Sequence, residues 1–365
     1  MATYDQTESR GHSKPLVVMT GGTGLIGSSL IERLVDRYRL VNLDLEGDPE
    51  SSPHVEFIPT DLTSDTSVSR AVERIAGQYG SHIASLVHLA AFYDFAGEDS
   101  PLYDEVTVEG TRRLLEAITK LRVDQVVFSS TMLVHEPTTP GKPIDEDDAI
   151  EATWPYPESK VETEDVVSEE TTAETKAVVV RLAGIYDEMG HSPPITNQIK
   201  RIDGKWVTSH FYPADLERGQ AFVHLDDAVD AITRIVDRRS DLPDDVEILI
   251  AEPVTLGYGQ LQDLIARELH GTDWTTMEIP EAMAKAGAWF REKNPFGEDP
   301  FIRSWMVDRA SDHYEIDISR ARELLDWKPE HTVDEVVPEM IRRLEADREG
   351  WYRENDLTPP ATIAA

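Results

Sequence analysis

Residues 15–30, PLVVMTGGTGLIGSSL, are the stretch that decides the fold. The apolar run at residues 16–19 predicts a buried strand, and an amphipathic pattern that continues to about residue 36 predicts a helix. The glycine-rich turn TGGTGLIG, residues 20–27, lies between them. This order of strand, turn and helix is typical of a dinucleotide-binding unit, and the alternative is a plain turn between a strand and a helix.

Each glycine of the turn has its own predicted role. Gly21 permits the tight turn, Gly24 lets the backbone approach a pyrophosphate, and Gly27 lets the new helix pack against the strand. The diphosphate would lie on free N–H groups at the helix N-terminus. The candidate cofactor-binding residues of the turn are therefore Gly21, Thr23, Gly24, Leu25, Ile26 and Gly27.

An acid stands where a cofactor ribose would be bound. A second strand is predicted at residues 39–44 and ends in Asp44, 17 residues after Gly27. A carboxylate there accepts hydrogen bonds from both ribose hydroxyls and repels a 2′-phosphate, which favours NAD over NADP. The alternative is an aspartate that only caps a turn.

The next two predicted strands add further candidate contacts to the cofactor. After a strand at residues 55–58, Asp61 either meets the adenine amino group or caps the helix that begins near residue 65. A strand at residues 83–91 ends in small residues that would let a cofactor lie close. The candidate cofactor-binding residues of these two segments are Asp61, Leu62, Leu89, Ala90 and Ala91.

Strands and helices continue to alternate along the chain. Helices are predicted at residues 101–120 and 157–170, and strands at residues 124–130 and 176–182. This alternation predicts an α/β fold with a Rossmann-type, doubly wound parallel sheet and a smaller C-terminal α/β substrate lobe. The expected organisation is a disordered lead-in at 1–14, an NAD-binding domain at 15–185 to which about 221–251 return, a substrate-binding lobe at 186–350 and a tail at 351–365.

Composition limits the compartment and the chemistry. The chain has 365 residues and no cysteine, which excludes disulfides, thiolate metal sites and thiol nucleophiles. No apolar run approaches the roughly 20 residues that span a bilayer. The first residues are polar, so we expect a cytoplasmic protein without a membrane partner.

The charge balance is strongly acidic. Asp and Glu total 70 against 35 Lys and Arg, a net charge of −35, and such a surface repels nucleic acid and anionic membranes. It also repels itself, unless molar salt shortens the Debye length to about 3 Å. We therefore expect a halophilic protein adapted to a salt-rich cytoplasm, and the alternative is an acidic mesophilic protein.

Three residues suggest the chemistry. Tyr156 and Lys160 lie four residues apart, so both project from one face of the predicted helix. A nearby ammonium stabilises a phenolate and lowers the pKa of the tyrosine, which makes it a better base at neutral pH. Thr131 stands at the C-terminal end of the fifth strand, the edge at which parallel sheets bind ligands. The candidate catalytic residues are therefore Thr131, Tyr156 and Lys160, and the last two are also candidate cofactor contacts.

Together these segments resemble the extended short-chain dehydrogenases/reductases of the NAD-dependent epimerase/dehydratase group, over roughly residues 16–344. The resemblance implies NAD as cofactor, Tyr156 as the acid/base, Lys160 as its partner and ribose ligand, and Thr131 as the ligand of the substrate hydroxyl. It also implies a homodimer that forms through the two long helices. Further matching segments are HLAA (88–91), GT (110–111), FSST (128–131), RLAGIY (181–186), FVHLDD (222–227) and LDWKP (325–329).

Several positions depart from the family pattern. Met-Leu at 132–133 follows Thr131, where 4,6-dehydratases carry an Asp-Glu pair for water loss. Gly184 stands where nucleotide-sugar enzymes carry an asparagine, and Asp-Glu at 187–188 replaces a Gly-Pro. An acidic pair does not favour a diphosphate, so these differences weaken the nucleotide-sugar interpretation. The arginines that remain as candidate diphosphate ligands are Arg201, Arg218, Arg303 and Arg309.

Other polar and aromatic residues carry weaker signals. His224 is expected to be structural, and no spacing of His, Asp and Glu suggests a metal site. Trp154 either walls the substrate site or packs a loop, and residues 135–153 are expected to form an exposed loop. The aromatic residues Trp274, Trp289, Phe290, Phe301 and Trp305 line an apolar substrate pocket or, as the stronger expectation, pack a core.

Three functions follow from these observations. The leading hypothesis is an NAD-dependent oxidoreductase or epimerase that acts on a secondary alcohol or keto carbon of a sugar or nucleotide-sugar type substrate. The second is a hydroxysteroid-dehydrogenase-like or ketone-reductase-like enzyme for a less polar alcohol. The third is a non-catalytic NAD-sensing protein, against which the intact catalytic set argues.

Overall fold

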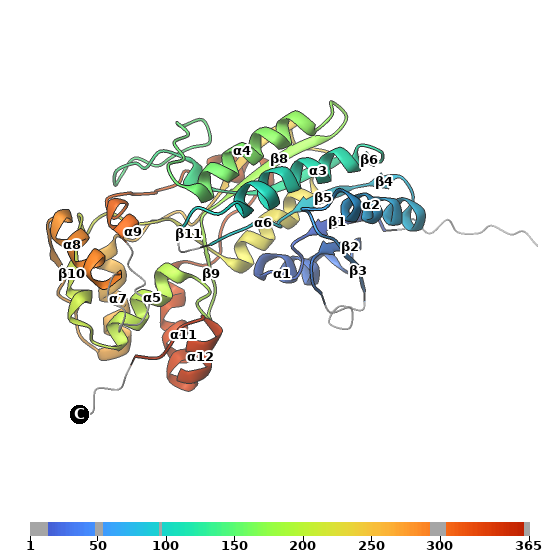
Figure 1. Ribbon diagram of the computed structural model, residues 1–365. Helices are drawn as coiled ribbons and strands as arrows, with labels where there is room; N and C mark the ends of the chain where they lie inside the picture. The colour runs from blue at the N-terminus through green and yellow to red at the C-terminus, as the bar shows by residue number, and fades with distance from the viewer. Residues whose placement is uncertain (1–13, 48–53, 95–96, 293–303, 361–365) are drawn as a thin grey trace, which may run out of the picture.

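Seven parallel strands form the central sheet of the computed structural model, which describes residues 14–47, 54–94, 97–292 and 304–360 (Figure 1). The strand order is β12-β8-β7-β5-β1-β2-β3. The chain builds outward from β1 in one direction and then crosses to β5, and this reversal is the point at which such sheets bind ligands. The strands are β1 (Leu16–Thr20), β2 (Arg39–Asp44), β3 (Val55–Pro59), β5 (Ser85–His88), β7 (Gln125–Thr131), β8 (Lys176–Leu182) and β12 (Asp245–Ile250).

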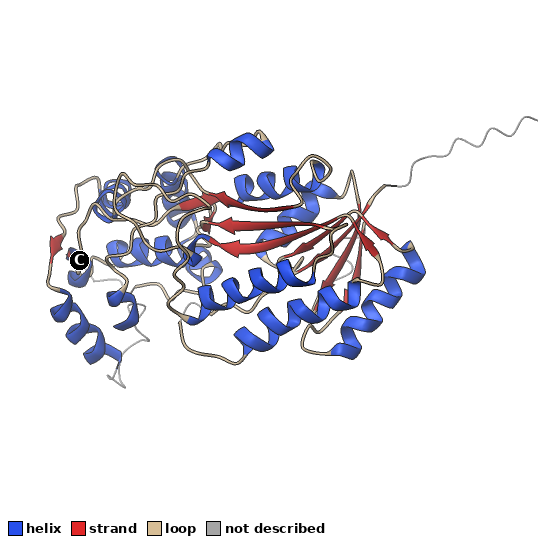
Figure 2. Ribbon diagram, turned by 90° about the horizontal axis from the view of Figure 1, so that it is seen from above, coloured by secondary structure: helices blue, strands red, loops and turns tan. Residues whose placement is uncertain are grey.

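Helices cover both faces of the sheet (Figure 2). On one face α1 (Leu25–Leu34), α6 (Leu225–Asp237) and α10 (Ser319–Leu325) share a hydrophobic core with the strands. On the other face α2 (Asp65–Tyr79), α3 (Glu109–Ile118) and α4 (Pro155–Glu170) share a second core. This arrangement confirms the predicted doubly wound α/β fold, because the strands are buried on both sides.

A smaller lobe lies beyond the C-terminal edge of the sheet and has a third hydrophobic core. Its helices are α5 (Pro193–Asp203), α7 (Tyr258–His270), α8 (Glu281–Glu292), α9 (Ser304–Asp308), α11 (Val333–Ala346) and α12 (Arg348–Glu354). Short parallel pairs join its segments, namely β9 (Gly184–Tyr186) with β11 (Phe222–His224), and β10 (Phe211–Tyr212) with β13 (Met277–Glu278). A third pair, β4 (His82–Ile83) with β6 (Arg122–Val123), extends the other end of the main sheet.

Two expected segments differ from the structure. The tail expected from residue 351 is wrong at its start, because Trp351 and Tyr352 are buried in α12 and belong to the third core. The exposed loop expected at residues 135–153 is also wrong in part. Glu146 is buried there and accepts a hydrogen bond from the backbone N–H of Leu249 at 2.8 Å.

The helix expected at residues 101–120 is not a uniform α-helix. Its first turns form a π-helical segment, η1 (Tyr103–Val108), before α3 begins at Glu109. Short 3₁₀ turns, η2 (Met132–Val134) and η3 (Val207–His210), follow later in the chain. Within the described ranges, every helix is too short or too polar to cross a membrane.

Candidate active site

The glycine turn has the geometry that its sequence predicts. Gly21 has a φ of +71°, and a Cβ there would lie 2.8 Å from the backbone nitrogen of Ala90. A Cβ on Gly27 would lie 2.2 Å from the carbonyl oxygen of Gly21, so the first turn of α1 packs directly on the loop. Gly24 meets no such obstacle, with its nearest neighbour at 3.4 Å. The space over Gly24 is therefore left open for something outside the chain.

The open side of this turn fits a dinucleotide diphosphate. Thr23, Gly24 and Leu25 are exposed, and no side chain caps the N-terminus of α1. A helix N-terminus without a protein cap offers N–H groups and a partial positive charge to an anion. Leu89, Ala90 and Ala91, at the end of β5, are partly buried beside this turn.

Asp44 ends β2, as predicted, and lies against the glycine turn. Its Oδ2 accepts hydrogen bonds from the backbone N–H of Thr23 at 3.2 Å and from its hydroxyl at 2.7 Å, and its Oδ1 accepts from Leu45 N–H at 2.9 Å. A carboxylate has about four lone-pair positions, so it can hold the turn and still accept a ribose hydroxyl. The same geometry therefore allows Asp44 both to cap the turn and to bind a cofactor ribose.

The next two candidate cofactor contacts, Asp61 and Leu62, lie in different surroundings. Ser64, not Asp61, caps α2, because the Ser64 side chain accepts from the backbone N–H of Ser67. The Asp61 carboxylate instead accepts from the N–H and hydroxyl of Thr63, at 2.9 and 2.7 Å. Leu62 is 7% exposed and packs in the core under α2 and α3, so only its backbone can reach a cofactor.

The three candidate catalytic residues come together at the C-terminal edge of the sheet. Thr131 ends β7, Tyr156 lies in the first turn of α4, and Lys160 follows one turn later. The Thr131 hydroxyl is hydrogen-bonded to the Tyr156 phenol. The Lys160 ammonium donates to the carbonyl oxygen of Ser129 at 2.8 Å and lies 5.9 Å from the centre of the Tyr156 ring.

Burial dominates the protonation of this set. It raises the pKa of Tyr156 to about 12, although the hydrogen bond from Thr131 acts in the opposite direction. Burial also lowers the pKa of Lys160 to about 8, against the opposing effect of the Glu164 carboxylate. The net effect of the surroundings is thus a raised Tyr156 pKa, dominated by desolvation of the phenolate, and the expected lowering by Lys160 stays a prediction.

A buried ion pair supports Lys160 from the next turn of α4. Glu164 binds Arg181 of β8 through two contacts, at 2.7 and 3.2 Å, and the Ser130 hydroxyl donates to the same carboxylate. The Arg181 and Glu164 side chains are only 6% and 13% exposed. Arg181 also contacts His135 at 3.1 Å, which explains why the start of the loop at 135–153 is buried.

Aromatic rings surround the phenol of Tyr156. The ring of Tyr93 stands edge-on to it at 4.9 Å, and that of Trp154 lies 5.6 Å away. Trp154 thus borders the catalytic residues, which is the first of its two expected roles. Sequence reasoning missed Tyr93, which carries no motif and reaches the site only because its loop follows β5.

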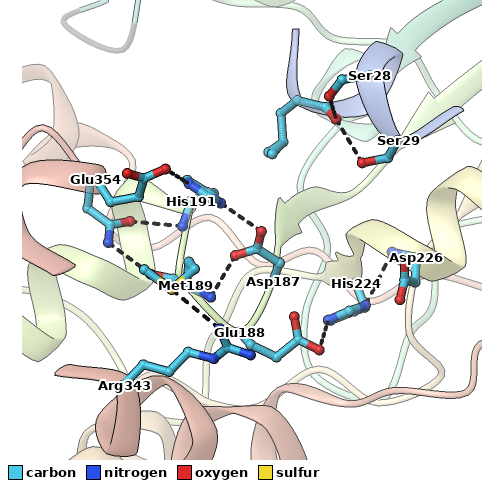
Figure 3. A network of polar contacts seen from close by, with 12 residues as sticks. Ser28, Ser29, Asp187, Glu188, Met189, His191, His224, Asp226, Arg343 and Glu354 are labelled. Carbon is cyan, nitrogen blue, oxygen red and sulfur yellow. Dashed lines mark hydrogen bonds and ion pairs between the residues drawn. The ribbon is translucent and has the colours of Figure 1, made fainter. Parts of the chain in front are cut away.

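The positions that depart from the family pattern have packing reasons. A Cβ on Gly184 would lie 2.9 Å from the Phe222 ring, so an asparagine there, as in nucleotide-sugar enzymes, would require this ring to move. Asp187 faces inward and pairs with His191 at 2.7 Å, while a Glu188 oxygen lies 3.7 Å from Nε2 of His224 (Figure 3). Each acid thus has a histidine ring nitrogen within 4 Å.

Three of the four candidate diphosphate ligands are already bound within the protein. Arg201 is buried and donates to the Tyr258 hydroxyl at 3.1 Å and to a backbone carbonyl. Arg218 donates to two backbone carbonyls, and Arg309 contacts Asp312 and donates to the carbonyl of residue 153 at 3.0 Å. Arg303 lies outside the described residues.

One of the weaker aromatic signals, Trp274, is explained by packing. Trp274 stacks on His210 at 4.3 Å and packs against the third core, as the stronger expectation had it. Phe301 lies outside the described residues, as do the side chains of Trp289, Phe290 and Trp305.

One group of possible metal ligands occurs among the residues that the structure describes, formed by His224, Asp226 and His331. His224 Nδ1 accepts from the backbone N–H of Asp226 and so caps α6. The His331 ring stacks on His224 at 4.1 Å, and its Nδ1 contacts Asp227 at 3.1 Å. The cap on α6 is a structural contact of His224, and the expectation that this histidine is structural stays a prediction.

Residues 17–250, more than half of the chain, match the NAD dependent epimerase/dehydratase family. The chain belongs to this family. The predicted resemblance to this family of extended short-chain dehydrogenases/reductases is thereby confirmed.

The most similar relatives fall into two groups. Human 3 beta-hydroxysteroid dehydrogenase type 7 is 30% identical over 234 residues, which are 59% of this chain and 62% of that protein. The chain thus spans less than two thirds of this relative. Sterol-4-alpha-carboxylate 3-dehydrogenase ERG26 of Candida albicans is 24% identical over 86% of this chain and 93% of that protein. UDP-glucose 4-epimerase of Mycolicibacterium smegmatis is 25% identical over 89% and 96%.

Solved structures share the fold. MoeE5 in complex with UDP-glucose and NAD superimposes with a TM-score of 0.66 at 20% identity, covering 93% of this chain and 98% of that one. UDP-glucose 4-epimerase from Thermotoga maritima with UDP-glucose gives 0.66 at 21% identity, covering 91% and 99%.

Proposed function

We propose that this protein catalyses NAD-dependent hydride transfer at a secondary alcohol or keto carbon of a sugar or nucleotide-sugar type substrate. The supporting observation is that Thr131, Tyr156 and Lys160 meet at the sheet edge that also carries the open glycine turn. The nicotinamide supplies the hydride acceptor or donor when it is bound. A catalytic set of this kind has no role in the alternative of a non-catalytic NAD-sensing protein.

Three side chains of the protein perform the other parts of the proposed reaction. Tyr156 takes the proton of the substrate hydroxyl or returns it, and Thr131 holds the substrate oxygen beside the phenol. Lys160 supplies a positive charge that favours the phenolate, and it binds the cofactor ribose. If the oxidised product leaves, the enzyme is a dehydrogenase, and if the hydride returns to the other face, it is an epimerase.

A second candidate substrate is a less polar alcohol, as in hydroxysteroid dehydrogenases and ketone reductases. Its support is that Arg201, Arg218 and Arg309 are already bound to groups of the protein. A diphosphate needs cations, which these residues would have to release first. Two of the relatives are named as a hydroxysteroid and a sterol dehydrogenase.

Replacement of Tyr156 by phenylalanine tests the proposed mechanism. The variant lacks the phenolic proton and keeps the ring, so turnover should fall by about 10²–10⁴-fold while NAD binding stays within about twofold. Turnover is measured with the substrate identified by mass spectrometry of copurifying molecules, and NAD binding by calorimetry. Full activity in Tyr156→Phe would show that another group moves the proton.

A homodimer through α3 and α4 also belongs to the proposal. The outer face of α4 carries a stripe of exposed acids, which two copies would bring together. We therefore infer that such a dimer needs salt to screen this charge. The acids of the stripe are Glu158, Glu162, Asp165 and Glu169.

A further inference from the structure

Tyr93 places a large aromatic surface beside the proposed catalytic phenol. Its ring meets the Tyr156 ring edge-on, with the centres 4.9 Å apart and the planes at 75°. Even so, Tyr93 is 51% exposed, one of the large apolar residues that the described chain leaves in solvent. An exposed aromatic ring that borders reactive groups is typical of a ligand-contact surface.

The neighbours of Tyr93 fix its backbone on both sides. The N–H of Phe92 donates to the Thr107 hydroxyl at 2.9 Å, and the N–H of Asp94 faces the Tyr103 hydroxyl at 3.3 Å. The rings of Phe92 and Tyr103 also pack edge-on at 4.8 Å. Tyr103 and Thr107 both belong to η1, and π-helical turns are frequent at functional sites. The backbone on both sides of Tyr93 is therefore anchored to η1, and such anchoring lowers the entropy cost of ordering the segment on binding.

The surroundings of this ring favour an apolar partner. Trp154 provides a second ring, whose centre lies 5.6 Å from that of Tyr156. The Arg309 guanidinium lies over the Trp154 ring, 5.9 Å from its centre. Arg309 is itself held by Asp312 and a backbone carbonyl, and Lys160 points its ammonium at the Ser129 carbonyl. The ring neighbours of Tyr156 are thus the aromatic side chains of Tyr93 and Trp154, and aromatic faces bind flat hydrocarbon surfaces well.

We propose that Tyr93 determines the substrate specificity of this site. The Tyr93 ring packs against an apolar ring of the substrate. When that substrate ring carries the reacting carbon, this packing places the carbon next to Tyr156. This inference rests on the proposed function and deepens its second candidate. The substrate class that it names is a cyclic, mainly hydrocarbon secondary alcohol or ketone.

Two ketones with ten carbons each separate ring recognition from general hydrophobic binding. 2-Decalone presents its carbonyl on a fused ring, whereas 2-decanone presents it on an open chain. We measure their dissociation constants by calorimetry with NADH-loaded full-length protein, and their turnover in parallel. In Tyr93→Ala we expect 2-decalone to bind about tenfold more weakly and 2-decanone to change less than twofold.

Two further variants complete the design. Tyr93→Phe keeps the ring and should bind 2-decalone within twofold of the wild type. Tyr79→Ala removes a tyrosine at the end of α2, where its hydroxyl contacts Glu56 near the start of β3, at the sheet edge opposite the catalytic residues, and should also stay within twofold.

Each other outcome has a defined meaning. The inference fails if the wild type does not bind 2-decalone, if Tyr93→Ala binds it normally, or if that variant loses both ketones alike, which is the result of simple support for Tyr156. If the wild type binds 2-decalone in a Tyr93-dependent way without turning it over, the role of Tyr93 stands. The proposed hydride transfer at this class of substrate then fails separately.

Discussion

Lys160 is a buried cation whose charge state lies within reach of ordinary buffers. Burial lowers its pKa to about 8, and the Glu164 carboxylate, one turn away, limits the shift. Glu164 is itself fixed by Arg181 of the neighbouring strand. The ammonium that supports Tyr156 is therefore present at neutral pH and is lost on the alkaline side.

This geometry predicts that the rate of ketone reduction falls as the pH becomes alkaline. Tyr156, with its pKa raised to about 12, stays protonated as the acid, so the group that titrates first is Lys160. The rate of reduction should fall about tenfold for each pH unit above about 8, measured as kcat/KM in NADH. In Lys160→Arg the guanidinium stays charged, so this alkaline fall should vanish from whatever activity remains. A wild-type profile that is flat up to pH 10 would show that this charge does not matter.

Some features of this site can be predicted from the sequence, and others cannot. Spacing alone is enough to place Tyr156 and Lys160 on one face of a helix, because a helix repeats every 3.6 residues. It does not give the pKa of Tyr156, since desolvation depends on atoms from several distant segments. Tyr93 has no signal at all, because its contact with Tyr156 joins positions 63 residues apart in the chain.

Among the secondary-structure elements, strands could be predicted from the sequence, whereas the helix α12 could not. The strands β2 and β8 occupy the predicted residues 39–44 and 176–182, since a continuous apolar run in a parallel sheet is a local signal. The helix α12 lies in a segment predicted to be a tail. Its Trp351 and Tyr352 are buried only because α11 and α5 provide a surface for them.

The turn at residues 187–191 is an element held by side chains from the far end of the chain. Gly190 has a φ of +111° and His191 a φ of +43°, both in the left-handed region. The Asn355 side chain accepts from the His191 N–H at 2.9 Å and donates to the Met189 carbonyl at 2.8 Å. Figure 3 shows how Asp187 and Glu354 approach the His191 ring from two sides. The turn therefore depends on α12 as well as on its own residues.

The ion pair in this turn should make stability depend on pH. The hydrogen bond that the His191 ring donates to Asp187 raises the pKa of His191 above 6.5, so its contribution is full below pH 6.5 and is lost as pH rises through the raised pKa. Burial would raise the pKa of Asp187, but its bonds with His191 lower it below 3.8, so that contribution is lost only in stronger acid. The pair should contribute on the order of 1 kcal/mol between about pH 4 and 6.5.

His191→Asn isolates this contribution, because asparagine tolerates the left-handed backbone and does not titrate. Denaturant unfolding of the wild type and the variant at pH 5.5 and pH 9 measures it. The difference in free energy of unfolding should be larger at pH 5.5 than at pH 9. An equal difference at both pH values would mean that the pair contributes nothing through its charge.

At the scale of the whole molecule, charge is the dominant property. The net charge of −35 is spread over one chain, and acids outnumber bases two to one. Many basic side chains are already paired, such as Arg112 with three glutamates and Arg320 with three acids. The excess acids, including the exposed stripe on α4, repel one another in dilute buffer.

A salt series tests what this charge implies. Between 0.1 M and 2 M KCl the Debye length falls from about 10 Å to below 3 Å, so repulsion within the folded chain is screened. We expect the melting temperature to rise by about 5 °C or more, and sedimentation to shift from monomer towards dimer as the α4 stripes become compatible. Sucrose at matched osmolality is the control, because it favours compact states without screening charge. A melting temperature that rises equally in sucrose and KCl would assign the effect to solvent exclusion, and a monomer throughout the KCl series would remove the dimer from the proposal.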